Sequence, residues 1–387
     1  MSRRRIKSSF HGLLILIPLA LVALFFFLSS DDRPEPEEKS GDRVSRSPLA
    51  ELSRRPDWTK LKRFQNTLSL ETFRSRLETI YTRDDSWKTW ITLDERARQA
   101  DLGDLTLAFA DEDQPAPAAH YRWKRRSDLA PGRGLPLAGL KIALDPGHIG
   151  GKYAALEERE YRFGDTVIQE GTMTLRTAKV LAPLLEKRGA SVTLVRSTLE
   201  PVTGKRADDF PDPRLFYRTA EIRERARLIN DFIQPDLVIC LHYNGSASKI
   251  PELSQHFHLI LNGTYTAGEL AHEDERFEML QRLLSGTITE EIPLAREVAG
   301  AFNDLTSLPP YRYPENSPTS QNLDHHPNLW GRNLLANRLY QCPVIFLEPY
   351  VMNSLPFLAR YRRDPEEIYQ EYARAVAEGL ARYYSHP

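Results

Sequence analysis

The stretch LKIALDPGHIGG, residues 140–151, joins an apolar run to a turn that presents one histidine, His148. The apolar run has the length and composition of a buried strand, and Asp-Pro-Gly is typical of a tight turn. A histidine on such a turn is either an ordinary loop residue or a ligand at the mouth of a strand. Residues further along the chain distinguish between these two possibilities.

Three more apolar runs follow in the same part of the chain, and segments with helical periodicity, such as 172–188 and 223–232, lie between the runs. These runs are ASVTLVRS at 190–197, DLVICLH at 236–242 and CPVIFLE at 342–348. Strands that are apolar throughout and alternate with helices are typical of a parallel sheet covered on both faces. The sequence therefore predicts a three-layer α/β/α fold with a mainly parallel sheet over residues 136–387.

The composition narrows the class of protein. The net charge is −1 and no basic stripe is present, so nucleic acid is not predicted as a partner. The only two cysteines, Cys240 and Cys342, lie inside apolar runs. This placement predicts buried free thiols and excludes a disulfide scaffold.

The N-terminal residues predict a membrane segment. A basic start precedes an uncharged apolar stretch at residues 13–28, and no small-x-small cleavage site follows it. This pattern predicts an uncleaved anchor within residues 1–30, with a removed signal peptide as the alternative. Because the basic end stays in the cytoplasm, we expect a single-pass membrane protein whose remaining residues lie outside the cytoplasm, in the periplasm, or a secreted protein if the segment is cleaved.

Two further regions precede the α/β domain. Residues 31–48 are charged and contain prolines, which predicts a disordered tether. Residues 49–133 have mixed character and predict a small α+β domain of unknown role. Apolar residues at helical spacing follow Ser69, a suitable helix cap, and the stretches LTLAFA (105–110) and HYRWKRR (120–126) predict short strands.

Polar residues follow the ends of the predicted strands. The first strand leads to His148, the run at 236–242 ends in His242, and the run at 342–348 ends in Glu348. Glu170 begins the helix that leads to the next strand. Ligands of open α/β sheets bind at the carboxyl ends of the strands. We therefore expect two histidines and two carboxylates to converge at one edge of the sheet.

Two histidines and one carboxylate are typical ligands of a catalytic zinc ion, which keeps its fourth position for water. The second carboxylate would then take the proton of that water. Spacing alone does not distinguish the ligand from the base. Each residue also has an ordinary structural explanation, for instance a glutamate at a helix start, but four at matching ends favour a site. His256 and His258 are predicted to be surface or edge residues and not metal ligands.

Four segments together resemble the zinc-dependent N-acetylmuramoyl-L-alanine amidases, the type 3 amidase catalytic domain of bacterial cell-wall hydrolases. They are KIALDPGHIGG, EGTMTLRTAKVLAPLLEKRGASVTLVRST, RARLINDFIQPDLVICLHYNG and LLANRLYQCPVIFLEPYVMNS, and the resemblance covers residues 140–384. It implies zinc ligands at His148, Glu170 and His242, with Glu348 as the catalytic general base.

The resemblance also implies the reaction: hydrolysis, by zinc-activated water, of the amide between N-acetylmuramic acid and the first L-alanine of the stem peptide of peptidoglycan. The chain departs from the family in its long, charged loop at 152–169 and in Pro349, which follows the catalytic glutamate. Two alternatives are a zinc peptidase or deacylase on another envelope substrate, and a non-catalytic, anchored wall-binding protein. The intact His-Glu-His-Glu set argues against the second alternative.

The segment GELAHEDERFEMLQRLLSG, residues 268–286, lies where simpler family members run on directly. It has a partly apolar helical face and an acidic start at residues 272–275. Some amidases that the chain resembles carry a helix here that covers the zinc ion until a partner displaces it. One hypothesis is therefore that the segment forms a lid displaced by an activator protein, and the alternative is a surface helix whose acidic first turn suits the helix dipole.

Overall fold

The structure is a computed structural model that describes residues 55–114, 122–130, 134–246 and 253–385. Residues 46–387 belong to one compact unit. The predicted membrane anchor at 1–30 and the predicted tether at 31–48 lie outside the described residues. Within the described ranges, no helix is both long and apolar enough to cross a membrane.

A seven-stranded sheet forms the centre of the unit, in the order β10-β11-β9-β12-β8-β4-β7. Its strands are β4 (Lys141–Pro146), β7 (Ser191–Leu194), β8 (Leu237–Leu241), β9 (Phe257–Leu261), β10 (Gln321–Asn322), β11 (Leu329–Gly331) and β12 (Val344–Pro349). Strands β12, β8, β4 and β7 are parallel to one another. Strand β9 is antiparallel to β12, β11 is parallel to β9, and β10 is antiparallel to β11. The predicted mainly parallel sheet is therefore confirmed.

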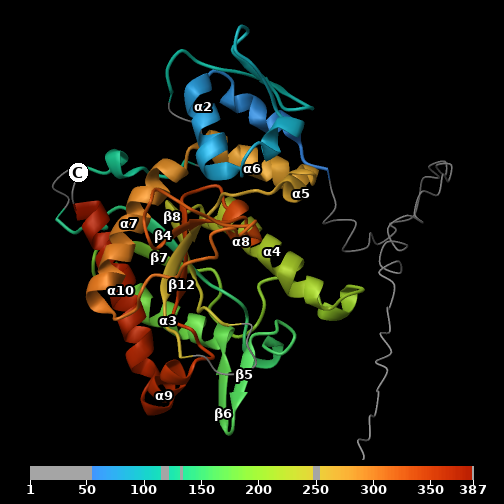
Figure 1. The fold of residues 1–387 in the computed structure, drawn as a ribbon. Coiled ribbons are helices and arrows are strands. Elements are labelled where there is room, and N and C mark those ends of the chain that lie inside the picture. The colour runs from blue at the N-terminus through green and yellow to red at the C-terminus, as the bar shows by residue number, and fades with distance from the viewer. Residues whose placement is uncertain (1–54, 115–121, 131–133, 247–252, 386–387) are drawn as a thin grey trace, which may run out of the picture. The chain divides into compact units, whose positions relative to one another are not determined.

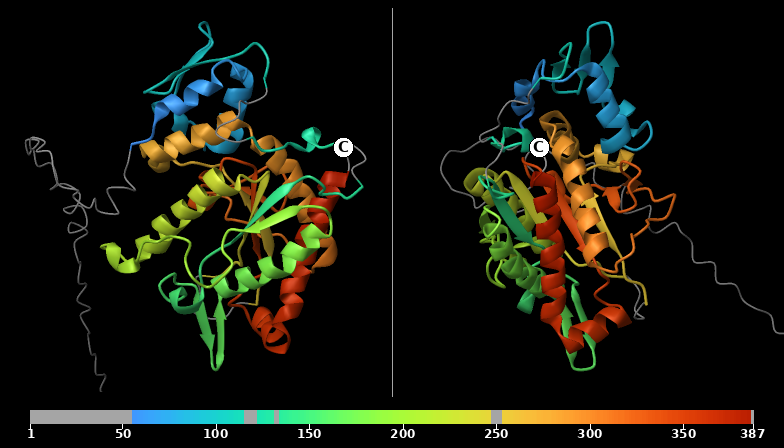
Figure 2. Two further views of the ribbon diagram at one scale, coloured as in Figure 1. Left: turned by 180° about the vertical axis from the view of Figure 1, so that it is seen from behind. Right: turned by 90° about the vertical axis from the view of Figure 1, so that its left-hand side faces the viewer.

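Helices cover both faces of this sheet (Figure 1). On one face lie α3 (Glu170–Glu186), α7 (Ile288–Leu305) and α10 (Pro365–Ser385), and on the other lie α4 (Ile222–Arg227) and α8 (Leu335–Arg338). Alternate residues of each strand belong to the two faces: in β12, Ile345 and Leu347 pack in the core with α10, whereas Val344 and Phe346 pack in the core with α4. Figure 2 shows this layering from two further directions.

Local signals in the sequence mark where the helices begin. Helix α10 starts with Pro365, and the side chain of Asp364 accepts a hydrogen bond of 3.0 Å from the backbone N–H of Glu366. Proline at the first helical position and a carboxylate cap in front of it are a favourable helix start.

The two cysteines are buried and form no disulfide, as predicted.

Residues 55–114 form an α+β region beside the sheet domain. It contains the helical segments Trp58–Phe64, α2 (Leu70–Arg76) with its continuation Leu77–Tyr81, and Ser86–Thr89, and a small antiparallel sheet of β1 (Thr92–Asp94), β2 (Gln99–Asp101) and β3 (Thr106–Ala108). Ser69 caps α2 as predicted, because its hydroxyl accepts a hydrogen bond from the N–H of Thr72. The strand predicted at 120–126 is wrong: residues 122–125 form no strand, and a short 3-10 helix follows at Arg126–Asp128.

The segment 268–286 belongs to the core of this α+β region. It forms the end of α5 (Ala267–Leu270) and all of α6 (Glu273–Ser285), and α6 lies beside α2 (Figure 1). The apolar side chains that α6 contributes to the shared core are Phe277, Met279, Leu280, Leu283 and Leu284. Its apolar face therefore packs against the N-terminal region.

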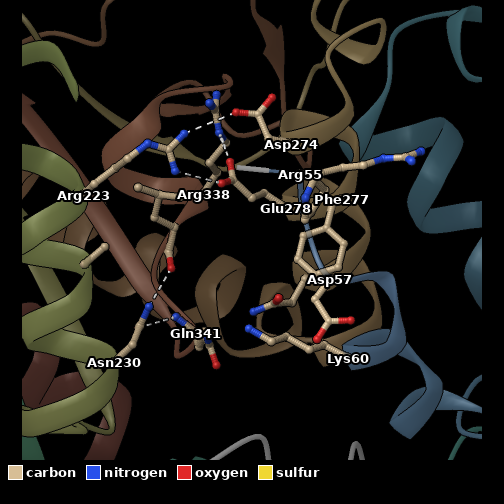
Figure 3. Close-up of a pocket in the computed structure, with 14 residues that line it drawn as sticks. Arg55, Asp57, Lys60, Arg223, Asn230, Asp274, Phe277, Glu278, Arg338 and Gln341 are labelled. Atoms are coloured by element: carbon tan, nitrogen blue, oxygen red, sulfur yellow. Dashed lines mark hydrogen bonds and ion pairs between the residues drawn. The ribbon is translucent and has the colours of Figure 1, made fainter. Parts of the chain in front are cut away.

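The acidic residues of α6 are paired away from the predicted zinc ligands. Glu273 accepts hydrogen bonds of 2.8 Å from Arg55 Nε and from Trp58 Nε1. Asp274 forms an ion pair of 3.3 Å with Arg223 at a cleft of about 530 Å³ (Figure 3).

Glu275 accepts hydrogen bonds from Asn333 at 2.6 Å and from Arg338 at 3.0 Å, and the ring of His272 is exposed. The lid hypothesis is therefore wrong for this segment, because its carboxylates are engaged elsewhere. An activator protein, which the resemblance suggested, stays a prediction.

We expect α6 to be required for stability instead. Leu280 is fully buried in the shared core, so Leu280→Ala should lower the free energy of unfolding by about 2–5 kcal/mol. Urea denaturation measures this change, and Leu305→Ala, at a leucine that is 46% exposed, is the matched control. Deletion of 268–286 should likewise impair folding. A deletion variant that folds normally and gains activity would contradict this assignment of α6.

Candidate active site

The structure brings His148, Glu170 and His242 together at the carboxyl ends of β4 and β8. One ligand atom from each residue lies within 4.8 Å of the other two, and all three residues are buried. Glu170 lies between the two rings: its Oε2 is 3.2 Å from His148 Nε2, and its Oε1 is 3.0 Å from His242 Nδ1.

The tight turn after β4 makes this approach possible. His148 has a φ of +59°, in the left-handed region that residues other than glycine rarely adopt. A Cβ atom on Gly147 would lie only 2.1 Å from the ring of His242. Asp145 and Pro146 still belong to β4, so the predicted turn begins later, and Gly147 and His148 provide the space for the second ring and the direction of His148.

Arg225, on α4, fixes the backbone of this turn. It is buried and forms ion pairs of 2.9 Å with Asp145 and 2.8 Å with Glu221. It also donates hydrogen bonds of 2.7 Å to the carbonyl oxygens of Pro146 and His148. Although burial alone would lower the pKa of Arg225, the two carboxylates raise it above its usual value. Its fork of donors therefore remains charged and directed at the turn.

Glu157 supports the turn from the other side. Its carboxylate accepts hydrogen bonds from the N–H groups of Ile149 at 2.7 Å and Gly150 at 3.0 Å. Its Oε1 is 3.7 Å from His148 Nδ1, a ring atom that has no hydrogen-bond partner in the described part of the chain. A carboxylate behind a ring nitrogen is the usual way in which the outer shell orients a metal-binding histidine.

The charges of the three residues suit a metal ion. Burial lowers the pKa of His148 to about 3, so the ring is neutral, as a metal ligand must be. Burial alone would raise the pKa of Glu170, but the rings of His148 and His242 hold it below its usual value. The group therefore contains a neutral ring at His148 and an ionised carboxylate at Glu170.

The geometry also fits zinc. Four ligands at 2.0–2.2 Å in a tetrahedron are roughly 3.3 Å apart. The separations of 3.0 and 3.2 Å between Glu170 and the two rings are close to that spacing. The two separations reach different oxygens of Glu170, and the three residues are of the types that hold a catalytic zinc ion, so the group could bind a metal.

Glu348 is the last residue but one of β12, the strand next to β8. In the parallel register between β12 and β8, Leu347 lies opposite Leu241. The next residues, Glu348 and His242, are therefore neighbours on the same face of the sheet. The ring of Phe346 stacks on His242 with centroids 4.1 Å apart.

Burial raises the pKa of Glu348 to about 7. His242 opposes this rise, Glu170 adds to it, and Arg159 and Arg332 oppose it. A carboxylate with a pKa near neutrality is suited to accept a proton and to return it.

The four predicted residues thus meet at one edge of the sheet, whereas several of their supporting residues were not predicted. Arg159 Nε lies 3.3 Å from Glu170, and Glu157 and Arg159 both come from the long charged loop, which also forms the hairpin of β5 (Glu160–Phe163) and β6 (Thr166–Gln169). The only sequence signal for them was the unusual charge of this loop.

The neighbouring histidines are placed differently from the prediction in one respect. Neither His256 nor His258 is part of the group of three candidate ligands. His258, however, is buried, and its strand β9 is a central strand, so it is neither a surface nor an edge residue.

Several solved structures of amidases are similar to this chain. The solved N-acetylmuramyl-L-alanine amidase of Mycobacterium smegmatis is similar at 18% identity over 65% of this chain and 99% of its own, with a TM-score of 0.42. The CwlD amidase of Clostridioides difficile, solved in complex with the GerS lipoprotein, is similar at 13% identity over 64% and 100% of the chains, with a TM-score of 0.42. An amidase of Nostoc punctiforme is similar at 17% identity over 64% and 98%, with a TM-score of 0.39.

A search of curated protein sequences finds no match. The family model of N-acetylmuramoyl-L-alanine amidases matches residues 142–382 of the 387 in the chain. The matched residues include the His-Glu-His group and Glu348. The chain therefore belongs to the N-acetylmuramoyl-L-alanine amidase family and is a peptidoglycan hydrolase.

Proposed function

We propose that the protein hydrolyses the amide between N-acetylmuramic acid and L-alanine with a zinc ion held by His148, Glu170 and His242. Glu348 is the general base. The observation that carries this proposal is the buried His-Glu-His group, in which one carboxylate lies between two imidazole rings, with a second carboxylate on the adjacent strand.

Each residue has a distinct part in the reaction. When bound, zinc supplies a Lewis acid that lowers the pKa of water towards about 7 and polarises the scissile carbonyl. Glu348 accepts a proton from the attacking water and transfers it to the nitrogen of L-alanine as that nitrogen leaves. Arg225 and Glu157 hold the turn of His148, so that the ligand geometry does not have to form during catalysis.

Metal removal tests the proposal. Dialysis against a chelator should abolish hydrolysis of purified peptidoglycan, and one equivalent of zinc per chain should restore it. Magnesium should not, because it prefers oxygen ligands and an octahedral arrangement. Full activity in protein shown to be free of transition metals would contradict the role of zinc.

We expect the rate to fall as the pH falls, because only the ionised form of Glu348 accepts a proton. Burial raises the pKa of this carboxyl to about 7, and a nearby dication lowers it again by stabilising the carboxylate. The acidic limb of kcat/KM in the zinc-loaded enzyme should therefore have its midpoint below 7. A profile that rises as the pH falls below this midpoint would contradict the assignment of Glu348.

We also propose that the enzyme acts outside the cytoplasmic membrane, where its substrate lies. The basic start and the apolar stretch at 13–28 support this location, with a retained anchor or a cleaved signal as the two forms. Protease added to spheroplasts should digest an anchored catalytic domain. Soluble protein that begins near residue 29 would favour the cleaved form, and a protease-resistant cytoplasmic protein would contradict both.

A further inference from the structure

The part of the sheet beyond Glu348 carries a group of rings on the face of the active site. In the register between β12 and β9, Glu348 lies directly opposite His258. Trp330 on β11 lies beside Ile260 of β9, two residues after His258. Residues opposite one another share a face and alternate residues return to it, so Glu348, His258 and Trp330 are all on one face.

The rings on this face contact one another in series. The ring of Tyr311 lies 4.4 Å from that of His256 and 4.9 Å from that of His258, and Tyr313 lies 5.0 Å from Trp330, measured between centroids. We call these five residues the aromatic wall. It begins beside the general base and extends away from the metal ligands, across β9 to β11.

Arg332 lies at the far end of the aromatic wall. Its Nη1 donates to the hydroxyl of Tyr313 at 3.4 Å, and its guanidinium is 5.9 Å from the centre of that ring. The same hydroxyl is 3.1 Å from His258 Nε2. Since this hydroxyl accepts a hydrogen bond from Arg332, its own proton is available to His258. The three side chains form one chain of contacts that ends next to Glu348.

Two arginines, Arg159 and Arg332, act on the charge of Glu348, and they differ in whether they pair with a carboxylate. Arg159 already has a carboxylate, Glu170, at 3.3 Å. Arg332 is only partly buried and, in the part of the chain that the structure describes, no carboxylate lies within 4.0 Å of it. Its charge nevertheless reaches the active site, since it helps to lower the pKa of Glu348.

A guanidinium that lacks a carboxylate and is partly removed from water binds a carboxylate in preference to a neutral group. The substrate offers such groups on one side of the scissile bond only. The lactyl carboxyl group of muramic acid is consumed in the amide, whereas the stem peptide carries a C-terminal carboxylate and acidic side groups.

We propose that Arg332, positioned by Tyr313 and His258, binds a carboxylate of the stem peptide and so determines which peptides are cleaved. This inference rests on the proposed function. It makes Arg332 a specificity residue and makes the aromatic wall the surface along which the stem peptide would lie.

Two substrates that differ only in their carboxylates distinguish carboxylate binding by Arg332 from a purely structural role. Wild-type enzyme and Arg332→Gln would be compared on a muramoyl peptide with free carboxylates and on the same peptide with its carboxylates amidated. A charge-assisted hydrogen bond is worth a factor of about 10–100, so kcat/KM of Arg332→Gln should fall by that factor on the free substrate. It should change little on the amidated substrate. Arg332→Lys should recover part of the loss, and Arg312→Gln, at an exposed neighbouring arginine, should cause none.

An equal loss on both substrates, or no loss on either, would overturn the proposal. If Arg332 only kept Glu348 ionised, Arg332→Gln would instead move the acidic limb of both profiles to higher pH. Tyr313→Phe, which keeps the ring, is the second variant if Arg332→Gln does not fold, and its smaller loss should again be confined to the free substrate.

Binding of the released peptide gives a result that is independent of turnover. Calorimetry should show about tenfold weaker binding of the free-carboxylate peptide to Arg332→Gln than to wild type, and no difference for the amidated peptide. If wild type cleaves neither substrate, the proposed function fails, and this binding difference still decides the role of Arg332. Equal binding of both peptides to both proteins would reject it.

Discussion

Replacing Glu348 by glutamine should abolish turnover while zinc remains bound. The side chain keeps its shape but can no longer accept a proton from water. Loss of one positioned base reduces the rate by about 10²–10⁴. Glu348 lies on β12, outside the group of three ligands, so the metal content of Glu348→Gln should equal that of wild type.

Two measurements on the same preparation check this result: zinc by atomic absorption and kcat on purified muropeptides. Glu315→Gln, at an exposed carboxylate, is the matched control and should keep full activity. Full activity in zinc-loaded Glu348→Gln would remove Glu348 from the mechanism. Loss of zinc together with activity would make it a ligand instead of the base.

Replacing a zinc ligand should also abolish activity, but in this case the bound zinc should be lost as well. His148→Ala and His242→Ala each leave a set of two ligands, so both should lose bound zinc as well as activity. Glu170→Gln removes the charge between the rings and should do the same.

His272→Ala is the control for the ligand variants. This histidine is exposed at the start of α6, and its variant should retain zinc and activity. A His148→Ala or His242→Ala protein that retains one equivalent of zinc and full activity would contradict the ligand assignment.

The positions of the strands could be predicted because their signal is local. Each of the four apolar runs is bounded by turn residues or a helix start, and each forms a strand of the sheet. The direction of β9 could not be predicted. Its run FHLIL is buried throughout, and such a run has the same composition whether its neighbour is parallel or antiparallel.

The site residues could be predicted for the same reason. They stand at the carboxyl ends of strands or at the first residue of a helix, positions that follow from the strand assignments alone. Their supporting residues depend on contacts between distant segments. Arg225 pairs with Asp145 from 80 residues away, and no local pattern in the sequence indicates such a pair.

Helix α6 shows a further limit of local patterns. Its apolar face correctly predicts a helix with one buried side, but the face does not show what covers it. Leu280 and Leu283 pack in the core of the N-terminal region, a set of contacts made with residues some two hundred positions earlier, such as Phe73. An acidic first turn is compatible with a lid and with ordinary ion pairs, and here it forms the ion pairs.

The central claim is that this site cuts the bond between muramic acid and L-alanine. Mass spectrometry of purified peptidoglycan after digestion, with wild type and zinc-loaded Glu348→Gln in parallel, tests it most directly. The account predicts that wild type releases peptides with a free N-terminal alanine and leaves glycan strands with a free lactyl carboxyl group, and that Glu348→Gln releases neither. Shortened peptides that remain attached to muramic acid through L-alanine would contradict it and identify a peptidase.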